Sequence, residues 1–188
     1  MENKINLILD ENTKVIKSIK NLTPIIANIS KKIINAYKNK KKVILFGNGG
    51  SAADAQHIAA EFVGKFYKDR DSLPALAFHT NTSVVTATAN DFGYDLVFER
   101  QVASFVENGD IVIGISTSGN SPNVIKGLIK AKEKGAITVG FTGQKPSKVE
   151  DITDICLKIP STDTPRIQEG HITVGHIICY LVEKELFG

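Results

Sequence analysis

The chain has 188 residues, of which 42% are hydrophobic and 23% charged, a composition typical of one globular domain with a sizeable core. Its net charge of +3 suits an anionic ligand, and it is far from the strongly basic balance of many nucleic-acid-binding proteins. No stretch reaches the roughly 20 apolar residues of a membrane span, and the first residues lack the apolar core of a secretory signal. Because Cys156 and Cys179 also form no paired motif, we expect a cytoplasmic protein with reduced thiols.

Residues 1–40 are predicted to form two helices. Apolar side chains recur at helical spacing in two groups, namely Ile5, Leu9, Ile16 and Ile19, and then Ile25, Ile29, Ile33 and Tyr37. Between the groups, Thr23-Pro24 is a typical helix start, because proline is well tolerated in the first turn. We therefore expect an N-terminal helical hairpin over residues 1–40.

The rest of the chain, residues 41–188, alternates between short β-branched segments and longer segments with helical spacing. The predicted strands are Val43–Phe46, Leu73–Phe78, Ile111–Ile115, Ile137–Phe141 and Ile155–Ile159, and a long helix is predicted for Ile167–Phe187. Such alternation favours a parallel sheet with helices on both faces. We therefore predict an α/β fold, a five-stranded parallel sheet in a Rossmann-like three-layer arrangement. Residues 1–188 form a single domain, since no linker interrupts them.

A lysine-rich run at residues 38–42 has two interpretations. It can belong to a nucleic-acid site, or it can complement the dipole at the end of a helix. We favour the helix end and expect no nucleic-acid partner, because no aromatic residues are interleaved for base stacking.

Two glycine- and hydroxyl-rich loops follow two of the predicted strands. The sequence G-N-G-G-S-A at 47–52 comes directly after the first strand, and S-T-S-G-N-S-P at 116–122 directly after the third. Ligands of α/β sheets bind at the carboxyl ends of the strands, where glycines permit close approach and helix N-termini attract anions. Hydroxyl groups add donors without bulk. We predict a phosphate pocket at Ser116–Ser121, with simple helix capping as the alternative.

The first loop also matches the dinucleotide pattern G-x-G-x-x-G/A through Gly47, Gly49 and Ala52. That pattern needs an acidic residue at the end of the next strand, whereas Asp69 and Asp71 precede the strand. The lysine-containing phosphate motif G-x-x-x-x-G-K-[ST] is absent as well. We therefore expect no nucleotide cofactor.

Candidate acid, base and metal-binding groups lie on two predicted helices. His57 and Glu61 are four residues apart, so their side chains share one helix face. Gln168 and His176 share the last helix, on which His171 is a further candidate that we interpret as structural. Eight residues of helix rise about 12 Å, so Gln168 and His176 do not meet at one small ion unaided. Either long side chains converge, or a neighbouring subunit completes the site.

Four sequence blocks stand out together: G-N-G-G-S-A-A-D-A-Q-H at 47–57, A-N-D-F-G-Y-D at 89–95, S-T-S-G-N-S at 116–121 and D-T-P-R-I-Q-E-G-H at 163–171. They resemble the sugar isomerase (SIS) domain family and, within it, the phosphoheptose isomerases. The resemblance implies conversion of D-sedoheptulose 7-phosphate to D-glycero-D-manno-heptose 7-phosphate through an enediol(ate). This is the first step of bacterial heptose synthesis for lipopolysaccharide, capsule or S-layer glycan. The resemblance also implies a homotetramer with active sites between subunits.

Carried over block by block, the resemblance assigns roles to individual residues. Glu61 and His176 are implied to be the catalytic pair. The implied substrate-binding residues are Asn48, Gly49, Gly50, Ser51, Glu61, Asn90, Asp91, Ser116, Thr117, Ser118, Ser121 and Gln168. Some members look to bind zinc through the equivalents of His57, Glu61, Gln168 and His176. Glu61 and His176 cannot be fully committed as ligands and also act freely as acid and base, and glutamine is a weak zinc ligand, so the sequence leaves both roles open.

Two other functions compete with the isomerase. A close relative in the family assists the replication initiator without catalysis, which predicts a disrupted acid–base set, yet all four candidate residues are present here. A sugar-phosphate sensor requires a DNA-binding module, and residues 1–40 contain no convincing one. We therefore place the isomerase first.

Lys65 stands at a position where the family that this sequence resembles usually has arginine. Lysine keeps the positive charge but lacks the planar guanidinium group of arginine, which puts a bidentate contact at this position in doubt.

Overall fold

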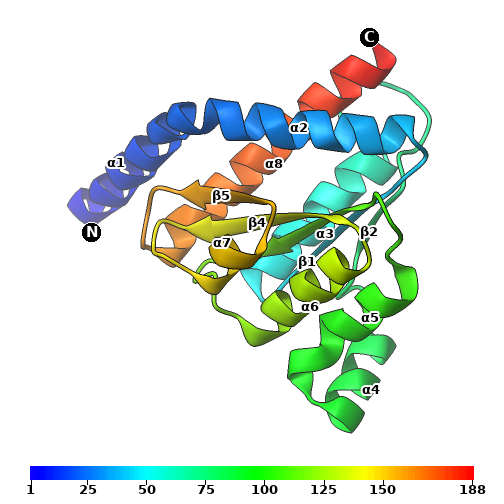
Figure 1. Ribbon diagram of the computed structural model, residues 1–188. Coiled ribbons are helices and arrows are strands. Elements are labelled where there is room, and N and C mark those ends of the chain that lie inside the picture. Colours follow the sequence, from blue (N-terminus) through cyan, green and yellow to red (C-terminus); the bar gives the residue numbers. More distant parts are fainter.

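Five short apolar segments form one parallel sheet in the computed structural model, which describes residues 1–188 (Figure 1). The strands are β1 (Val43–Gly47), β2 (Ala75–Ala77), β3 (Ile111–Ile115), β4 (Ile137–Gly143) and β5 (Ile155–Ile159). The helices are α1 (Glu2–Ser18), α2 (Thr23–Lys38), α3 (Gly50–Val63), α4 (Thr82–Phe92), α5 (Val97–Phe105), α6 (Pro122–Glu133), α7 (Lys148–Ile152) and α8 (Thr164–Phe187). The predicted α/β fold class is confirmed.

Helices cover both faces of the sheet, which explains why β1 and β3 are apolar without alternation. Every residue of these two strands is buried. Val43 and Leu45 face a core that they share with α2, α3 and α8, whereas Ile44 and Phe46 face a second core shared with α5, α6 and α7. The sheet is therefore the middle of three layers (Figure 1).

The strand order β2-β1-β3-β4-β5 contains one topological switch point. From β1 the chain crosses to one side to add β2, and from β3 it crosses to the other side to add β4 and β5. Parallel pairing aligns Gly47 at the end of β1 with Ile115 at the end of β3. The loops that follow these two strands therefore start at the same edge, where ligands of open α/β sheets bind.

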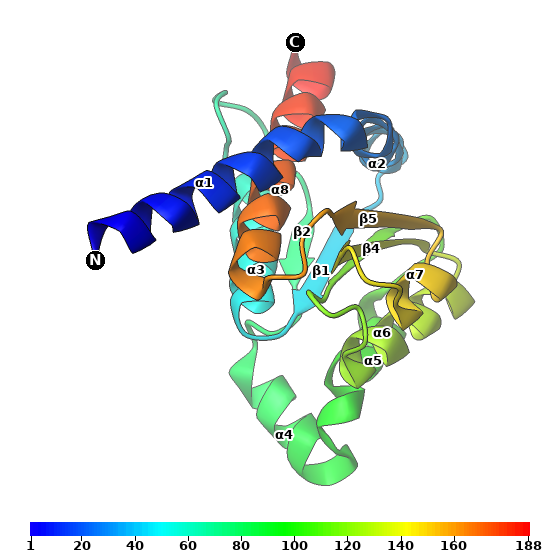
Figure 2. The same cartoon turned by 90° about the vertical axis from the view of Figure 1, so that its left-hand side faces the viewer.

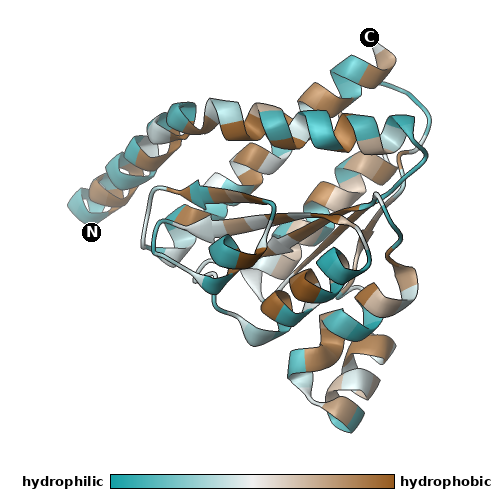
Figure 3. Cartoon of the chain, viewed as in Figure 1, coloured by the Kyte–Doolittle hydropathy of each residue, from teal (hydrophilic) through white to brown (hydrophobic).

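The two N-terminal helices are present, but they do not fold back on each other as a hairpin. A 3₁₀-helical turn, Ile19–Leu22, joins α1 to α2, and the two helices leave it in different directions (Figure 2). Each packs on α8, which offers the apolar surface that a hairpin partner would otherwise provide. No residue of α1 is buried, and the exposed fractions of Ile5, Leu7 and Ile8 are 49%, 64% and 50%. Brown apolar bands accordingly alternate with polar ones along α1 in Figure 3.

Two element boundaries differ from the sequence expectation. Strand β2 spans only Ala75–Ala77, because Pro74 has no N–H to extend the ladder and Leu73 donates its N–H to Phe62 instead. Helix α8 starts at Thr164, because proline in its first turn is compatible with a helix start.

The lysine-rich run connects α2 to β1, as the helix-end interpretation predicts. Helix α2 ends at Lys38, and Lys40 adopts a positive φ of 58°. The ammonium group of Lys42 lies 2.8 Å from Asp110 and 3.4 Å from Glu107. None of the helices combines the length and the apolar character that crossing a membrane requires.

Candidate active site

An amide pair joins the two glycine-rich loops at the switch point. Asn48, after β1, and Asn123, in the first turn of α6, each donate Nδ2 to the other's Oδ1 at 2.9 Å. The Tyr94 hydroxyl also donates to Asn48 Oδ1, at 3.2 Å. Asn48 is a predicted substrate ligand. Sequence reasoning assigned no role to Asn123 or Tyr94, although Tyr94 lies in the block at 89–95. Because Tyr94 follows α4, this contact ties the segment with Asn90 and Asp91 to the loop after β1.

The predicted phosphate loop is folded around its own hydroxyl groups. Ser116 Oγ lies 2.9 Å from Ser121 Oγ and 3.4 Å from Ser118 Oγ, and it accepts the N–H of Gly119 at 3.1 Å. Ser121 precedes α6, and its hydroxyl makes no capping bond to that helix. Three hydroxyl groups thus converge beside a helix N-terminus, an arrangement suited to binding an anion. The capping alternative does not account for this convergence.

A cavity of about 300 Å³ adjoins this loop. Thr117 and Ser118 line one side of it, and Gln144, Lys145 and Thr162 lie among the residues on the other. Sequence reasoning missed these last three residues, although Gln144 and Lys145 directly follow β4 at the same edge of the sheet. Gln144 and Lys145 could have been found from their position directly after a strand end, because ligands of α/β sheets bind at such ends. Lys145 places a positive charge beside a pocket of hydroxyl groups.

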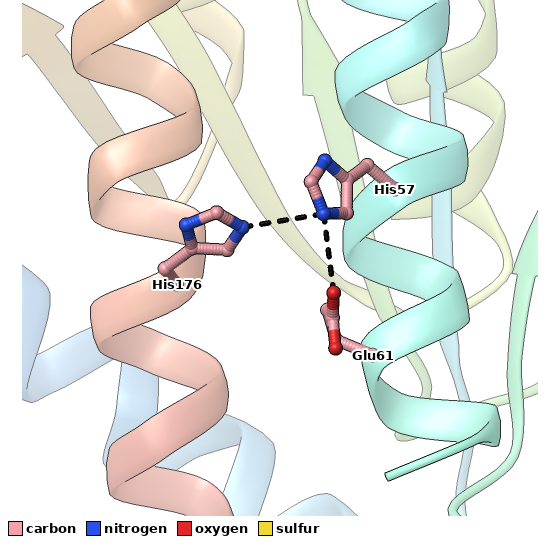
Figure 4. Close-up of side chains that lie close together, drawn as sticks. All are labelled: His57, Glu61 and His176. Atoms are coloured by element: carbon pink, nitrogen blue, oxygen red, sulfur yellow. Dashed lines mark hydrogen bonds and ion pairs between the residues drawn. The ribbon is translucent and has the colours of Figure 1, made fainter. Parts of the chain in front are cut away.

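Three of the four candidate acid, base and metal-binding residues on α3 and α8 meet at one point (Figure 4). His57 Nε2 lies 3.1 Å from Glu61 Oε1 on the same helix and 3.4 Å from His176 Nε2 on α8. The two imidazole rings pack edge to face, with their centroids 4.9 Å apart. Glu61 and His176 are half-buried and His57 is exposed. We call these three side chains the triplet.

The donor atoms of the triplet fit one metal ion. All three lie within 4.8 Å of one another, and they are two imidazole nitrogens and a carboxylate oxygen, the ligand types of catalytic zinc sites. Ligand bonds of about 2.0–2.2 Å in tetrahedral geometry place neighbouring ligand atoms about 3.3 Å apart. The separations of 3.1 Å and 3.4 Å match this value.

Gln168 is not part of the triplet within this chain. Its side-chain amide packs against Gly50, where a Cβ atom would collide with Gln168 Nε2. Gly50 starts α3 and lies seven residues before His57, which corresponds to about 10 Å along the helix. A zinc-binding role for Gln168 therefore requires a neighbouring subunit, whereas a substrate-binding role fits its place beside the loop after β1.

The other predicted substrate-binding residues lie at the entrances to the two loops or on α4. Gly49 is exposed and has a φ of +55°, which favours glycine, and Ser51 is buried in the first turn of α3. Asn90 and Asp91 are exposed at the end of α4, where Asn90 Nδ2 donates to Asp91 Oδ1 at 2.8 Å. In a single chain, no hydrogen bond joins them to the triplet.

Two titratable side chains near the triplet have distinct environments. Burial raises the pKa of Asp54 to about 6, although the charge of His57 opposes the shift. Its Oδ2 is buried without a hydrogen-bond partner. Sequence reasoning missed Asp54, which lies one turn before His57 on α3.

His171 is fully buried, and its Nε2 lies 3.2 Å from the Thr142 carbonyl oxygen. Burial lowers the pKa of His171 to about 4, which agrees with the expected structural role. Lys65 is exposed just after α3.

Comparisons with known proteins agree with this geometry. The SIS domain family matches residues 9–143. A phosphoheptose isomerase from Aneurinibacillus thermoaerophilus is 55% identical over 88% of this chain and 84% of its own length. Another from Clostridium acetobutylicum is 51% identical over 100% of this chain and 95% of its own. The solved structure of a phosphoheptose isomerase from Neisseria gonorrhoeae is 35% identical with a TM-score of 0.92, and the match covers 97% of this chain and 98% of that one.

Proposed function

Since this chain belongs to the SIS domain family, we propose that it is an aldose–ketose isomerase that converts D-sedoheptulose 7-phosphate to D-glycero-D-manno-heptose 7-phosphate. The single observation that carries the proposal is the meeting of Glu61, His57 and His176 in a domain whose predicted phosphate loop gathers three hydroxyl groups beside a helix N-terminus. The product supplies heptose for bacterial surface polysaccharide.

The reaction moves one proton between adjacent carbons and one between their oxygens. Glu61 takes the proton from C1 of the ketose and returns it to C2 of the aldose, with a cis-enediol(ate) between the two steps. His176 transfers the second proton, from the C1 oxygen to the C2 oxygen. The half-buried position of Glu61 and His176 limits exchange of the first proton with water. Glu61 Oε2 carries no protein partner, which leaves it available as the base, whereas Oε1 faces His57.

Phosphate binding positions the substrate for these transfers. The hydroxyl groups of Ser116, Ser118 and Ser121 and that of Thr117 donate to the phosphate oxygens, and Lys145 adds a positive charge beside them. Asn48, Gly49, Gly50 and Ser51, in the loop after β1 and the first turn of α3, contact the sugar, as does Gln168, which packs against Gly50. Asn90 and Asp91 contact the sugar from α4.

We also propose that the triplet can hold a Zn²⁺ ion, with Gln168 of a neighbouring subunit as the fourth ligand. His176 Nε2 is then a ligand and does not transfer the second proton, while Glu61 Oε2 stays available as the base. The support is the donor set and its spacing. When bound, the ion supplies positive charge that stabilises negative charge on the two substrate oxygens. The protein needs no nucleotide cofactor for this chemistry.

The exposed N-terminal helix α1 supports a proposal of self-association. Helix α1 packs on α8 yet has no buried side chain, and it exposes Ile5, Leu7, Ile8 and Leu9. A second copy of the chain is the natural cover for these residues, so we propose a homotetramer with active sites between subunits. The unpaired thiols of Cys156 and Cys179 suit the reducing cytoplasm, where we propose that the enzyme acts.

The test is direct. The protein is incubated with sedoheptulose 7-phosphate, with and without a chelator, and aldose formation is followed by NMR. The proposal expects turnover that the chelator diminishes. Absence of turnover in every condition, including added Zn²⁺, would overturn the enzyme assignment and favour the non-enzymatic interaction protein.

A further inference from the structure

A buried carboxylate on α8 anchors the segment that follows α3. The side chain of Glu183 is 3% exposed. Its Oε1 accepts the backbone N–H groups of Tyr67 at 2.8 Å and Lys68 at 3.0 Å, and its Oε2 accepts that of Phe66 at 3.0 Å and Arg70 Nε at 3.0 Å. Burial alone raises the pKa of a carboxyl group, but these four donors outweigh it and hold the pKa of Glu183 below its ordinary value. Glu183 thus stays ionised and fastens this segment to α8.

Its partner Arg70 binds the end of α3. The Arg70 side chain is 2% exposed, and its Nη2 donates to the Glu61 carbonyl at 2.9 Å while Nη1 donates to that of Phe62 at 2.9 Å. Helix α3 ends at Val63, and carbonyls in the last turn of a helix lack N–H partners from the next turn. Arg70 therefore donates to carbonyl groups in the last turn of α3. One of these carbonyls belongs to Glu61, whose side chain is part of the triplet.

The ion pair between Arg70 and Glu183 is also linked to His176, the triplet residue on α8. Glu183 follows His176 by seven residues on α8, so both side chains lie on the same face, two turns apart. The segment held by Glu183 carries Phe66, whose ring centroid lies 5.7 Å from that of His176. One residue before His176, Gly175 approaches α3 so closely that a Cβ atom would lie 2.6 Å from Ile58 Cδ1.

We propose that Arg70 and Glu183 are positioning residues for the triplet. Their ion pair fixes the separation of α3 and α8 that brings His176 to His57 and Glu61, and it holds Phe66 against the His176 ring. The inference rests on the proposed function only in taking the triplet as the catalytic centre. Neither residue is assigned a contact with substrate. A buried ion pair is by itself weak support for stability, which favours such a geometric role over a purely stabilising one.

The experiment follows the histidine ring signals by NMR, because the chain has four histidines and each can be assigned by a single substitution. In Glu183→Gln, the signals of His57 and His176 are expected to shift and broaden, while those of His79 and His171 stay at their wild-type positions. Phe66→Leu, which keeps the ion pair, is expected to shift the His176 signal most. If Glu183→Gln does not fold, Arg70→Lys provides the same measurement, since lysine keeps the charge without the fork that reaches two carbonyls.

The matched control is Asp110→Asn. Asp110 is also a fully buried carboxylate that accepts backbone N–H groups, from Lys42 at 3.1 Å and Glu107 at 2.8 Å, and pairs with a cation, but it lies just before β3 and has no bond to α3, to α8 or to residues 66–70. Its loss is expected to lower Tm without moving the His57 and His176 signals. Unchanged signals in folded Glu183→Gln, or equal shifts in Asp110→Asn, would overturn the proposal. The signals need no substrate, so this outcome is independent of whether the isomerase assay succeeds.

Discussion

His57 Nε2 and His176 Nε2 lie 3.4 Å apart although 119 positions separate the two residues in the sequence. Two imidazole lone pairs repel at this distance unless a proton or a cation lies between them. Glu61 Oε1, at 3.1 Å from His57 Nε2, adds negative charge at the same point. The contact between α3 and α8 therefore creates a place suited to a metal ion, and the following predictions test its chemistry and surroundings.

Glu61→Gln is expected to lower kcat by about 10²- to 10⁴-fold, the usual contribution of a positioned acid–base group. KM should change little, because the amide has the same size as the carboxylate. Aldose formation from sedoheptulose 7-phosphate measures both constants. The control is Glu185→Gln on α8, whose side chain is 61% exposed in a surface ion pair. Full activity of folded Glu61→Gln removes this residue from the catalytic pair.

Zn²⁺ affinity is expected to depend on both histidines of the triplet. His57→Ala and His176→Ala should each weaken binding at least about 10-fold, since even outer partners of a metal site contribute that much. Competition with a chromophoric chelator measures the affinity. Gln168→Ala separates two arrangements, because weaker binding in this variant means that the amide of another subunit completes the site. Wild-type affinity in both histidine variants contradicts the metal assignment.

Ser121→Ala is expected to raise KM by about 10- to 150-fold, which corresponds to the roughly 1.5–3 kcal/mol of a hydrogen bond to a charged group. The value of kcat should be largely retained, because the phosphate contact is equal in the ground state and the transition state. Ser104→Ala is the control, since this exposed serine on α5 bonds only to the Arg100 carbonyl. An unchanged KM in Ser121→Ala argues against phosphate binding by this loop.

His171 is expected to make stability depend on pH. Burial lowers its pKa from 6.5 in the unfolded chain to about 4 in the folded protein, so below pH 6.5 the unfolded state takes up the proton first. The free energy of unfolding should therefore decrease as pH falls from about 6.5 to about 4, by up to about 3 kcal/mol, and this contribution levels off below that range. Urea titrations at stepped pH measure it. His171→Gln should lose this part of the slope, and an identical slope in the variant contradicts the assignment.

Ile8→Asp is expected to dissociate the assembly, because it places a charge among the exposed apolar residues of α1. Sedimentation velocity across a range of protein concentrations measures the change. Asn3→Asp introduces the same side chain about 140° around α1 from Ile8 and should leave the assembly intact. Equal sedimentation of wild type and Ile8→Asp would show that this face is not an interface.

The strand pattern made the fold and half of the site predictable. Continuous apolar segments such as Val43–Phe46 and Ile111–Ile115 mark strands buried on both faces, and both are strands in the structure. The glycine- and serine-rich loops directly follow them, and strand ends are where such folds bind ligands. Local composition is enough for this inference, because strand, loop and helix start are neighbours in the chain.

The meeting of side chains across elements was not encoded in any local pattern. Nothing in the sequence around His57 indicates that His176 lies beside it, or that Asn123 pairs with Asn48, because these contacts depend on how α3, α6 and α8 pack. The prediction of an N-terminal helical hairpin was wrong for the same reason. Helix α2 packs on α8 and not on α1, and this choice depends on how the sheet and its helices assemble.

Packing of α2 against α8 also has a consequence for folding. Helix α8 follows every strand in chain order, so the face of the sheet that it covers with α2 and α3 stays open until residues 164–187 have been synthesised. All strand pairs are parallel and non-local, which slows folding further. The growing chain therefore exposes an apolar surface for most of its synthesis, and its yield in the cell depends on what shields that surface in the interval.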